Sequence, residues 1–268
     1  MSYQPPALFV AWRDPDSRRI FPVGRLLRLV TPFPGYEFGY IEGTRVAGQH
    51  GFQPFLAFPS LTTTYRSREL LPFFKNRVLS PSRPDYPEYV AALALDSAVE
   101  PMTLLAVSGG RRTTDLVELF PDWIRDLGSD RIHTRFLLRG VRHVQGAEAR
   151  VEALRIGEHL RWTQDVENAV NPRAVLLRTE DGAVIGYVPD YLAADVSELI
   201  EHETTMDVLV ERVNPLPAPR HLRVLCSLSA TAPPDDIGFK DPMFRPLAPE
   251  ATSIDDRAHA STPAIAIG

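Results

Sequence analysis

Residues Leu154–Pro189 read LRIGEHLRWTQDVENAVNPRAVLLRTEDGAVIGYVP, and the second half of this chain is organised around them. Leu160 and Trp162 alternate with polar neighbours, which is the pattern of a strand with one buried face. Residues 167–172 then break the alternation with asparagine and proline, two residues that favour turns. We therefore expect a strand followed by a long turn.

The next residues predict a hairpin and a helix. Residues 174–177 and 184–188 are apolar runs of strand length, and Gly182 between them can take the positive φ of a tight hairpin turn. Pro189 ends the second strand, and we expect Asp190 to cap the helix that follows. Spacings of i, i+4 and i+7 place the apolar residues of that helix on one face: Leu192, Val196, Leu199 and Ile200.

This half of the chain resembles the HIRAN domain, a small module of some chromatin and fork-remodelling helicases that also occurs without a helicase in bacterial proteins. The resemblance rests on the order of elements and on three pieces of sequence: Gly140-Val141-Arg142, the run ENAVNPRAV at 167–175, and Asp181-Gly182 followed by IGYVP at 185–189. It implies a mainly-β, OB-like barrel with one helix. It also implies a pocket that captures the 3′ end of single-stranded DNA.

The resemblance also assigns the candidate nucleic-acid-binding residues. Arg142 matches the pocket arginine of the family, and His143 follows it where the family has a tyrosine. Val170 and Asn171 stand at the positions of the family's tyrosine–aspartate pair. Valine has no flat face for base stacking, an interaction that contributes about 1–3 kcal/mol per base. Asparagine can accept a hydrogen bond from a 3′ hydroxyl, but without the charge that strengthens such a bond. We therefore expect weak binding of strand ends.

Structural roles are the alternative for the same residues. Asn168 and Asn171 are of a type that commonly holds a turn through bonds to local backbone groups. Arg142 is otherwise an exposed arginine on a strand that we predict over residues 136–144. We expect Gly186-Tyr187 to serve packing and the bend of the strand rather than ligand contact.

The first half of the chain predicts a mixed α+β domain, because short apolar strands and short helices follow one another without regular alternation. It loosely resembles the small N-terminal subdomain of HipA-type kinases, the toxins of some bacterial toxin–antitoxin systems. The residues behind this resemblance are Leu71-Pro72-Phe73-Phe74 with Val78-Leu79, residues 96–105 before Gly109-Gly110, and Leu119-Phe120-Pro121. No kinase core follows, so the resemblance implies a protein-interaction domain without phosphoryl transfer. The alternative is that Phe73 and Phe74 are simply core aromatics.

We expect three parts along the chain. They are an α+β interaction domain at residues 1–128, a HIRAN-like barrel at 132–230 and a disordered, proline-rich tail at 231–268. Apolar periodicity stops at the start of this tail, and such a composition buries too little apolar surface to offset the entropy of ordering. Residues 239–247 are the part of the tail that could dock on the rest.

The composition limits the functions that this chain can have. The net charge is -5 over 268 residues, and arginine supplies nearly all of the positive charge. Proteins that hold long nucleic acids through many phosphates usually have a basic face, so extended non-specific binding is not expected. No apolar run approaches the roughly 20 residues of a membrane span, and the first residues lack a secretory signal. We expect a cytoplasmic protein that does not bind membranes.

The sequence lacks the motifs of the common enzyme classes. It has no G-x-x-x-x-G-K-[ST] phosphate loop, no G-x-S-x-G elbow and no H-E-x-x-H helix, because Met206 stands where the second histidine would be. The single cysteine, Cys226, lies in the apolar phase of a strand, where a buried and inert thiol is expected. We expect no catalytic activity, no metal site and no cofactor.

The leading hypothesis is therefore a nucleic-acid-binding protein of bacterial type that recognises single-stranded DNA ends through the HIRAN-like barrel, with a protein partner for the N-terminal domain. The alternative is a protein–protein interaction module throughout, similar to a toxin–antitoxin partner and without DNA binding. A gel-shift experiment with a fluorescent single-stranded oligonucleotide separates the two.

Overall fold

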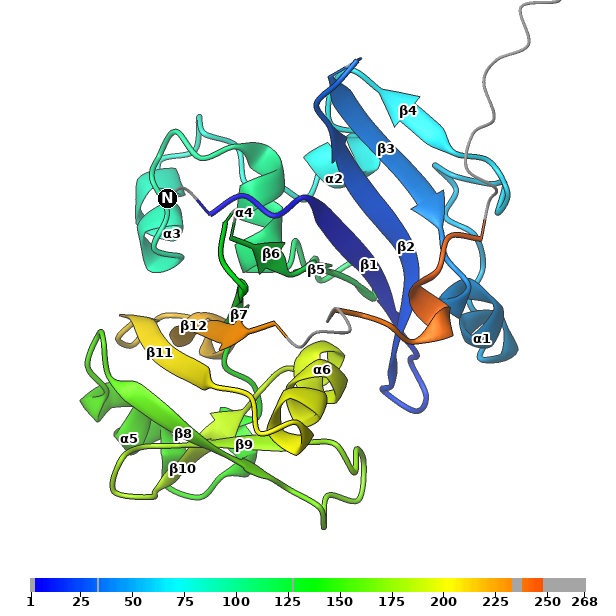
Figure 1. The fold of residues 1–268 in the computed structure, drawn as a ribbon. Helices are drawn as coiled ribbons and strands as arrows, with labels where there is room; N and C mark the ends of the chain where they lie inside the picture. The colour runs from blue at the N-terminus through cyan, green and yellow to red at the C-terminus, as the bar shows by residue number, and fades with distance from the viewer. Residues whose placement is uncertain (1–2, 33, 127, 233–237, 248–268) are drawn as a thin grey trace, which may run out of the picture.

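The computed structural model describes residues 3–32, 34–126, 128–232 and 238–247. The strands in these residues pair antiparallel and form a five-stranded and a seven-stranded sheet. Figure 1 shows the first sheet and its helices in the upper part of the view and most of the second sheet in the lower part, with its edge strand β6 labelled near β5. The predicted mixed α+β architecture with a β-rich second half is confirmed.

The five-stranded sheet has the order β4-β3-β2-β1-β5. Its strands are β1 (Ala7–Arg13), β2 (Ile20–Leu29), β3 (Gly35–Tyr40), β4 (Tyr65–Ser67) and β5 (Val117–Pro121). Residues 7–11 of β1 are all buried, as expected for a strand that is covered on both faces. The sheet therefore has its core on both sides of β1.

Short helices connect and cover these strands. They are α1 (Gly43–Gln49), α2 (Pro72–Lys75), α3 (Tyr86–Ala92) and α4 (Pro101–Ser108). The Glu100 carboxylate accepts a hydrogen bond from the backbone N–H of Thr103 at 3.1 Å, and Pro101 occupies the first turn, where its missing N–H is not needed. Gly109 ends α4 in the left-handed conformation, at φ 77°.

The seven-stranded sheet has the order β10-β9-β8-β11-β12-β7-β6. Its strands are β6 (Ile124–Arg125), β7 (Arg131–Leu137), β8 (His159–Gln164), β9 (Val175–Arg178), β10 (Val184–Tyr187), β11 (Met206–Val213) and β12 (Val224–Thr231). The helical segments of this half are η1 (Val141–His143), α5 (Ala147–Ala153), α6 (Asp190–Glu201), η2 (Arg220–Leu222) and η3 (Pro242–Phe244).

The predicted order of strand, long turn, hairpin and helix is confirmed. β8 is followed by the turn, then by the hairpin of β9 and β10, and then by α6. Gly182 in the hairpin has φ 87°, a conformation that glycine adopts without strain. Leu192, Val196 and Leu199 of α6 are fully buried, which agrees with the predicted apolar face.

The closed barrel that we expected is not formed by the described strands. The sheet is open between β10 and β6, and a single isolated bridge joins Tyr187 at the end of β10 to Arg139 beyond β7. Directly after this bridge, Gly140 has φ 72° and the chain turns into the 3₁₀ helix η1. The strand β7 is Arg131–Leu137, so the predicted strand over residues 136–144 began and ended too late and overlaps β7 only at residues 136–137.

The two halves share buried side chains. Phe9 of β1 lies in one apolar cluster with residues of the second sheet, and Leu137 of β7 lies in the other cluster with the first sheet. The helix α6 lies between the two sheets (Figure 1), where the indole N–H of Trp123 donates to Asp195 at 2.7 Å. In addition, β6 precedes the predicted boundary at residue 128 but pairs with β7. The halves are therefore packed together along this boundary.

Part of the predicted tail is packed against the rest. Phe239 is buried, and its ring lies 4.7 Å from that of Phe9. The segment then pairs with the chain beside α1, where Glu42 N–H donates to the Arg245 carbonyl and Leu247 N–H donates to the Tyr40 carbonyl, each at 2.9 Å. The remainder of the predicted disordered tail, residues 233–237 and 248–268, lies outside the described residues.

Candidate nucleic-acid interface

Arg142 and His143 lie on η1 rather than on a strand, and both are exposed. The Arg142 Nε–H donates to His143 Nε2 at 2.9 Å, so the two side chains lie together on the surface. Gly140 precedes η1 in the left-handed conformation, and this turn of the chain after β7 brings Arg142 and His143 to the surface. A guanidinium and an imidazole presented on one short turn provide donors for a phosphate and a ring for a base.

Asn168 holds the long turn between β8 and β9. Its Oδ1 accepts from the backbone N–H groups of Val170 and Asn171, each at 3.1 Å. Its amide nitrogen donates to Asp165 Oδ2, also at 3.1 Å. These are the local bonds that favour asparagine in turns, and they agree with the structural alternative for Asn168.

Asn171 is held by bonds within the chain as well. Its Oδ1 accepts from the Arg173 N–H at 2.9 Å, and its amide nitrogen donates to Asp190. Asp190 therefore does not cap α6 as we predicted; the cap position is Pro189, and the carboxylate of Asp190 bonds the turn instead. Val170 beside it is 86% exposed, so this position is open to solvent but offers only an aliphatic surface.

Tyr187 connects the two predicted parts of the site. Its backbone exchanges hydrogen bonds with Arg139 at 3.0 and 2.8 Å, and its hydroxyl donates to Asp165 Oδ2 at 3.1 Å. A Cβ at Gly140 would lie 2.7 Å from Cδ2 of the Tyr187 ring, so the ring packs directly against the start of η1. Burial raises the pKa of the Tyr187 hydroxyl, and the carboxylate of Asp165 adds to this effect.

From the sequence we expected Tyr187 to serve packing and the bend of the strand, and its hydroxyl bond to Asp165 was not foreseen. A half-buried tyrosine usually finds a partner for its hydroxyl, but the sequence does not show which carboxylate lies within reach. Through this pair the structure links η1 to the turn that carries Val170 and Asn171. The linked surface, Gly140–His143 with Tyr187, 165–171 and Asp190, is called the η1–turn surface below.

The η1–turn surface carries charged groups of both signs. Arg142 supplies a guanidinium, which forms strong bonds to phosphate oxygens. Asp165 and Asp190 supply carboxylates, which accept from hydroxyl groups. A nucleic-acid end presents both kinds of partner, a phosphate and a terminal hydroxyl.

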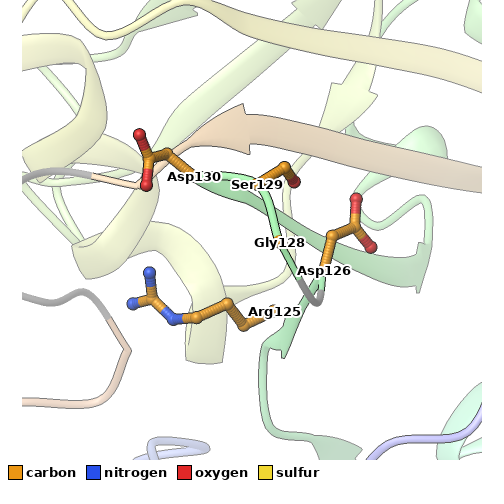
Figure 2. Close-up of a pocket in the computed structure, with 5 residues that line it drawn as sticks. All are labelled: Arg125, Asp126, Gly128, Ser129 and Asp130. Carbon is orange, nitrogen blue, oxygen red and sulfur yellow. The ribbon is translucent and has the colours of Figure 1, made fainter.

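A shallow hollow elsewhere in the molecule is unsuited to phosphate. It lies at the connection between β6 and β7 and is lined by Arg125, Asp126, Gly128, Ser129 and Asp130 (Figure 2). A phosphate there would meet two carboxylates, of which Asp126 already pairs with His133 at 3.2 Å. None of the predicted site residues lines this hollow.

Metal-ligand clusters and a reactive thiol are two features that the described residues can be searched for. No cluster of three histidine, cysteine, aspartate or glutamate side chains that could hold a metal ion occurs among these residues. The thiol of Cys226 is fully buried, and this burial raises its pKa, which makes it a poor nucleophile. None of the helices in the described residues is long and apolar enough to cross a membrane.

Comparison with known proteins places one domain in this chain. The family model of the HIRAN domain matches residues 133–232 and supports a HIRAN domain in the second half. The N-terminal half lies outside this match, so its resemblance to HipA-type kinases stays a prediction.

Two solved structures are similar to part of the chain. A protein from Lactobacillus plantarum has 16% identity and a TM-score of 0.31, over 37% of this chain and 96% of its own. The HIRAN domain of human HLTF has 14% identity and a TM-score of 0.29, over 41% of this chain and 79% of its own. No curated protein sequence matches this chain.

Proposed function

We propose that this protein binds nucleic acid through its HIRAN domain and holds the 3′ end of single-stranded DNA at the η1–turn surface, without catalysing a reaction. The observation that carries the proposal is the link through Tyr187, whose backbone bonds Arg139 and whose hydroxyl bonds Asp165. This link joins the arginine-bearing η1 to the turn that carries Val170 and Asn171. These are the segments that the resemblance assigned to one pocket.

Each group has a role in this proposal. Arg142 pairs with a phosphate near the end of the strand, and His143 lies against the terminal base. Asp190, which is bonded to Asn171, supplies a charged acceptor for the 3′ hydroxyl beside the uncharged amide of Asn171. Val170 gives no stacking face, so binding is weak, in agreement with the net charge of -5.

The test is fluorescence anisotropy with a single-stranded oligonucleotide labelled at its 5′ end. Arg142→Ala should weaken binding by about 1.5–3 kcal/mol, the scale of a hydrogen bond to a charged group, which is roughly a 10- to 150-fold loss. The matched control is Arg155→Ala. Arg155 is also exposed but precedes β8, whereas Asp165 follows it, so Arg155 lies at the opposite end of this strand. Equal effects of the two substitutions would contradict the proposal.

The end of the strand is tested with the same assay. A free 3′ hydroxyl should bind better than a 3′ phosphate, because a phosphate brings added negative charge towards Asp190. Equal binding of both ends would contradict end recognition while leaving general binding intact.

Val170→Tyr should tighten binding, because tyrosine supplies the stacking face that valine lacks, and the gain should approach 1 kcal/mol or more. This single substitution is preferable to a double one that includes Asn171→Asp, since an aspartate there would face the carboxylate of Asp190. The control is Ile156→Tyr, because Ile156 is 65% exposed but precedes β8, at the opposite end of this strand from the turn. If neither the native protein nor Val170→Tyr binds single-stranded DNA, the interaction-module hypothesis replaces this proposal.

The proposed lack of catalysis is tested separately. The purified protein should hydrolyse neither ATP nor a single-stranded phosphodiester, with or without divalent metal ions. Metal-dependent turnover that remains constant through further purification steps would show a catalytic site assembled from distant residues.

A further inference from the structure

A buried glutamate at the boundary between the two halves is surrounded by three arginines. Glu118 lies on β5, and its side chain is only 8% exposed. Arg139, which directly precedes Gly140, donates from Nη2 to Glu118 Oε1. Arg13 at the end of β1 approaches Glu118 Oε2 to 3.8 Å, and Arg111 in the loop between α4 and β5 approaches the same oxygen to 3.9 Å. We call these three residues the arginine cluster.

The arginine cluster carries more positive charge than Glu118 balances. Three guanidinium groups surround one carboxylate, which leaves an excess of two positive charges in a chain whose net charge is -5. At 3.8 and 3.9 Å, Arg13 and Arg111 attract Glu118 as charges but are too far from it for hydrogen bonds, which need about 3.2 Å or less. Their fork of N–H donors is therefore not used by this carboxylate.

The positive charge gathered here acts on the ionisation of Arg13 and of the neighbouring His221. Burial lowers the pKa of Arg13. The carboxylate of Glu118 raises this pKa, whereas the nearby positive charge of Arg111 lowers it further. Burial likewise lowers the pKa of His221, and Arg111 and Arg139 add to that effect. An anion bound among these groups would relieve the repulsion. The side chains are accessible for this, with exposed fractions of 26% for Arg13, 40% for Arg111 and 24% for Arg139.

The position of the arginine cluster connects it to the η1–turn surface. Arg139 belongs to both regions, because its backbone pairs with Tyr187 while its side chain bonds Glu118. Arg142 follows three residues later on η1. A strand whose end lies at Arg142 can therefore extend towards Arg139 and from there towards the N-terminal half.

We propose that the arginine cluster binds a backbone phosphate of the single-stranded DNA whose end the η1–turn surface holds, so that both halves of the chain contact the strand. Arginine suits this role because its planar fork can pair with two phosphate oxygens at once. The inference rests on the proposed function. It adds a phosphate contact in the N-terminal half, outside the matched HIRAN residues 133–232.

The salt dependence of binding tests this contact directly. Each phosphate contact to a single strand contributes about 0.7 to the slope of log K against log salt concentration. Arg111→Ala should reduce the slope by about this amount and weaken binding several-fold at low salt, measured with a single-stranded oligonucleotide that carries a free 3′ hydroxyl. Arg111→Lys keeps the charge and should keep the slope. Arg112→Ala is the matched control, because it removes the same charge from the next exposed residue.

For a second variant, Glu118→Gln, we expect DNA binding to change in the opposite direction. Glu118→Gln keeps the shape and an acceptor for Arg139 but removes the negative charge, so it should tighten DNA binding and steepen the salt dependence. A cluster that serves only to hold the two halves together predicts no such gain, because loss of the carboxylate would only weaken the fold. Thermal unfolding of each variant shows that the comparison is made between folded proteins.

The outcomes separate this inference from the proposed function. If the native protein binds DNA and loses affinity with Arg142→Ala, but Arg111→Ala and Glu118→Gln leave the slope unchanged, the phosphate contact is wrong and the proposed function stands. Equal slopes for Arg111→Ala and Arg112→Ala would also overturn it, since that result indicates general charge only. If the native protein binds no single-stranded DNA, both proposals fall.

Discussion

Asp195 gives the chain a pH dependence that can be worked out from its surroundings. Its side chain lies on α6 between the two halves and is 7% exposed. It accepts hydrogen bonds from the Trp123 indole N–H at 2.7 Å and from the Phe239 N–H at 3.2 Å. Burial outweighs these two bonds and raises the pKa of Asp195 from 3.8 to about 6.

The sign of the effect follows from where each state takes up the proton. As the pH falls, native Asp195 takes up its proton near pH 6, whereas the unfolded chain does so only near 3.8. The native state is therefore stabilised as the pH falls below about 6, and this stabilisation is lost as the pH rises again. A difference of about two pKa units changes the free energy of unfolding by roughly 3 kcal/mol when the pH crosses both pKa values. Between about pH 7.5 and 4.5 the change is about 2 kcal/mol.

Asp195→Asn isolates this contribution, because asparagine keeps an oxygen acceptor but does not ionise. Urea unfolding of both proteins across this pH range gives the difference in their free energies of unfolding at each pH. Other carboxylates titrate in both proteins and cancel in this difference. The native protein should gain about 2 kcal/mol relative to the variant as the pH falls from about 7.5 to 4.5. A difference that stays constant with pH would refute the argument that burial dominates at Asp195.

Four further substitutions test contacts of the second half and of residues 238–247. Gly140→Ala and Gly182→Ala each place an alanine in the left-handed backbone conformation, which should cost about 1–2 kcal/mol of stability. Only Gly140→Ala also places a Cβ 2.7 Å from the Tyr187 ring, so in thermal unfolding it should lower the melting temperature clearly more. Tyr187→Phe removes the hydroxyl bond to Asp165 and should lower the free energy of unfolding in urea by about 1 kcal/mol. An unchanged free energy of unfolding would show that this bond does not stabilise the fold. Phe239→Ala should cost about 3 kcal/mol or more and speed the proteolytic removal of residues 238–247; unchanged cleavage would show that the ring does not hold this segment.

The local part of the fold was predictable because its signals are local. The alternation around Leu160, the glycine at 182 and the proline at 189 each act through their own backbone or their nearest neighbours. Asn168 belongs to the same class, since its bonds reach only from Asp165 to Asn171. Periodicity and turn chemistry therefore gave β8 to α6 in the correct order.

Contacts between distant residues were not predictable in this way. Trp123 and Asp195 are 72 positions apart. Helical spacing places Asp195 beside Leu192 and Leu199 on the apolar face of α6, but it does not identify Trp123 as the partner. Likewise, the sequence did not show that the pairing of β10 with the segment after β7 is limited to the bridge of Arg139 with Tyr187. The predicted site residues Arg142 and Asn171 were placed by resemblance alone, and the Tyr187 hydroxyl that links their segments required the folded chain.

The strand β6 has a consequence for anyone who isolates the HIRAN domain. Sequence similarity begins at residue 133, yet β7 begins at Arg131 and its outer edge is covered by β6, at residues 124–125. A fragment of residues 133–232 would start inside a strand and leave that edge bare, and bare edges recruit strands from other molecules. It would also uncover Leu137 and Leu225, which pack among residues of the N-terminal half. The limits of the recognisable family are thus narrower than the smallest piece of this chain that we expect to remain monomeric in solution.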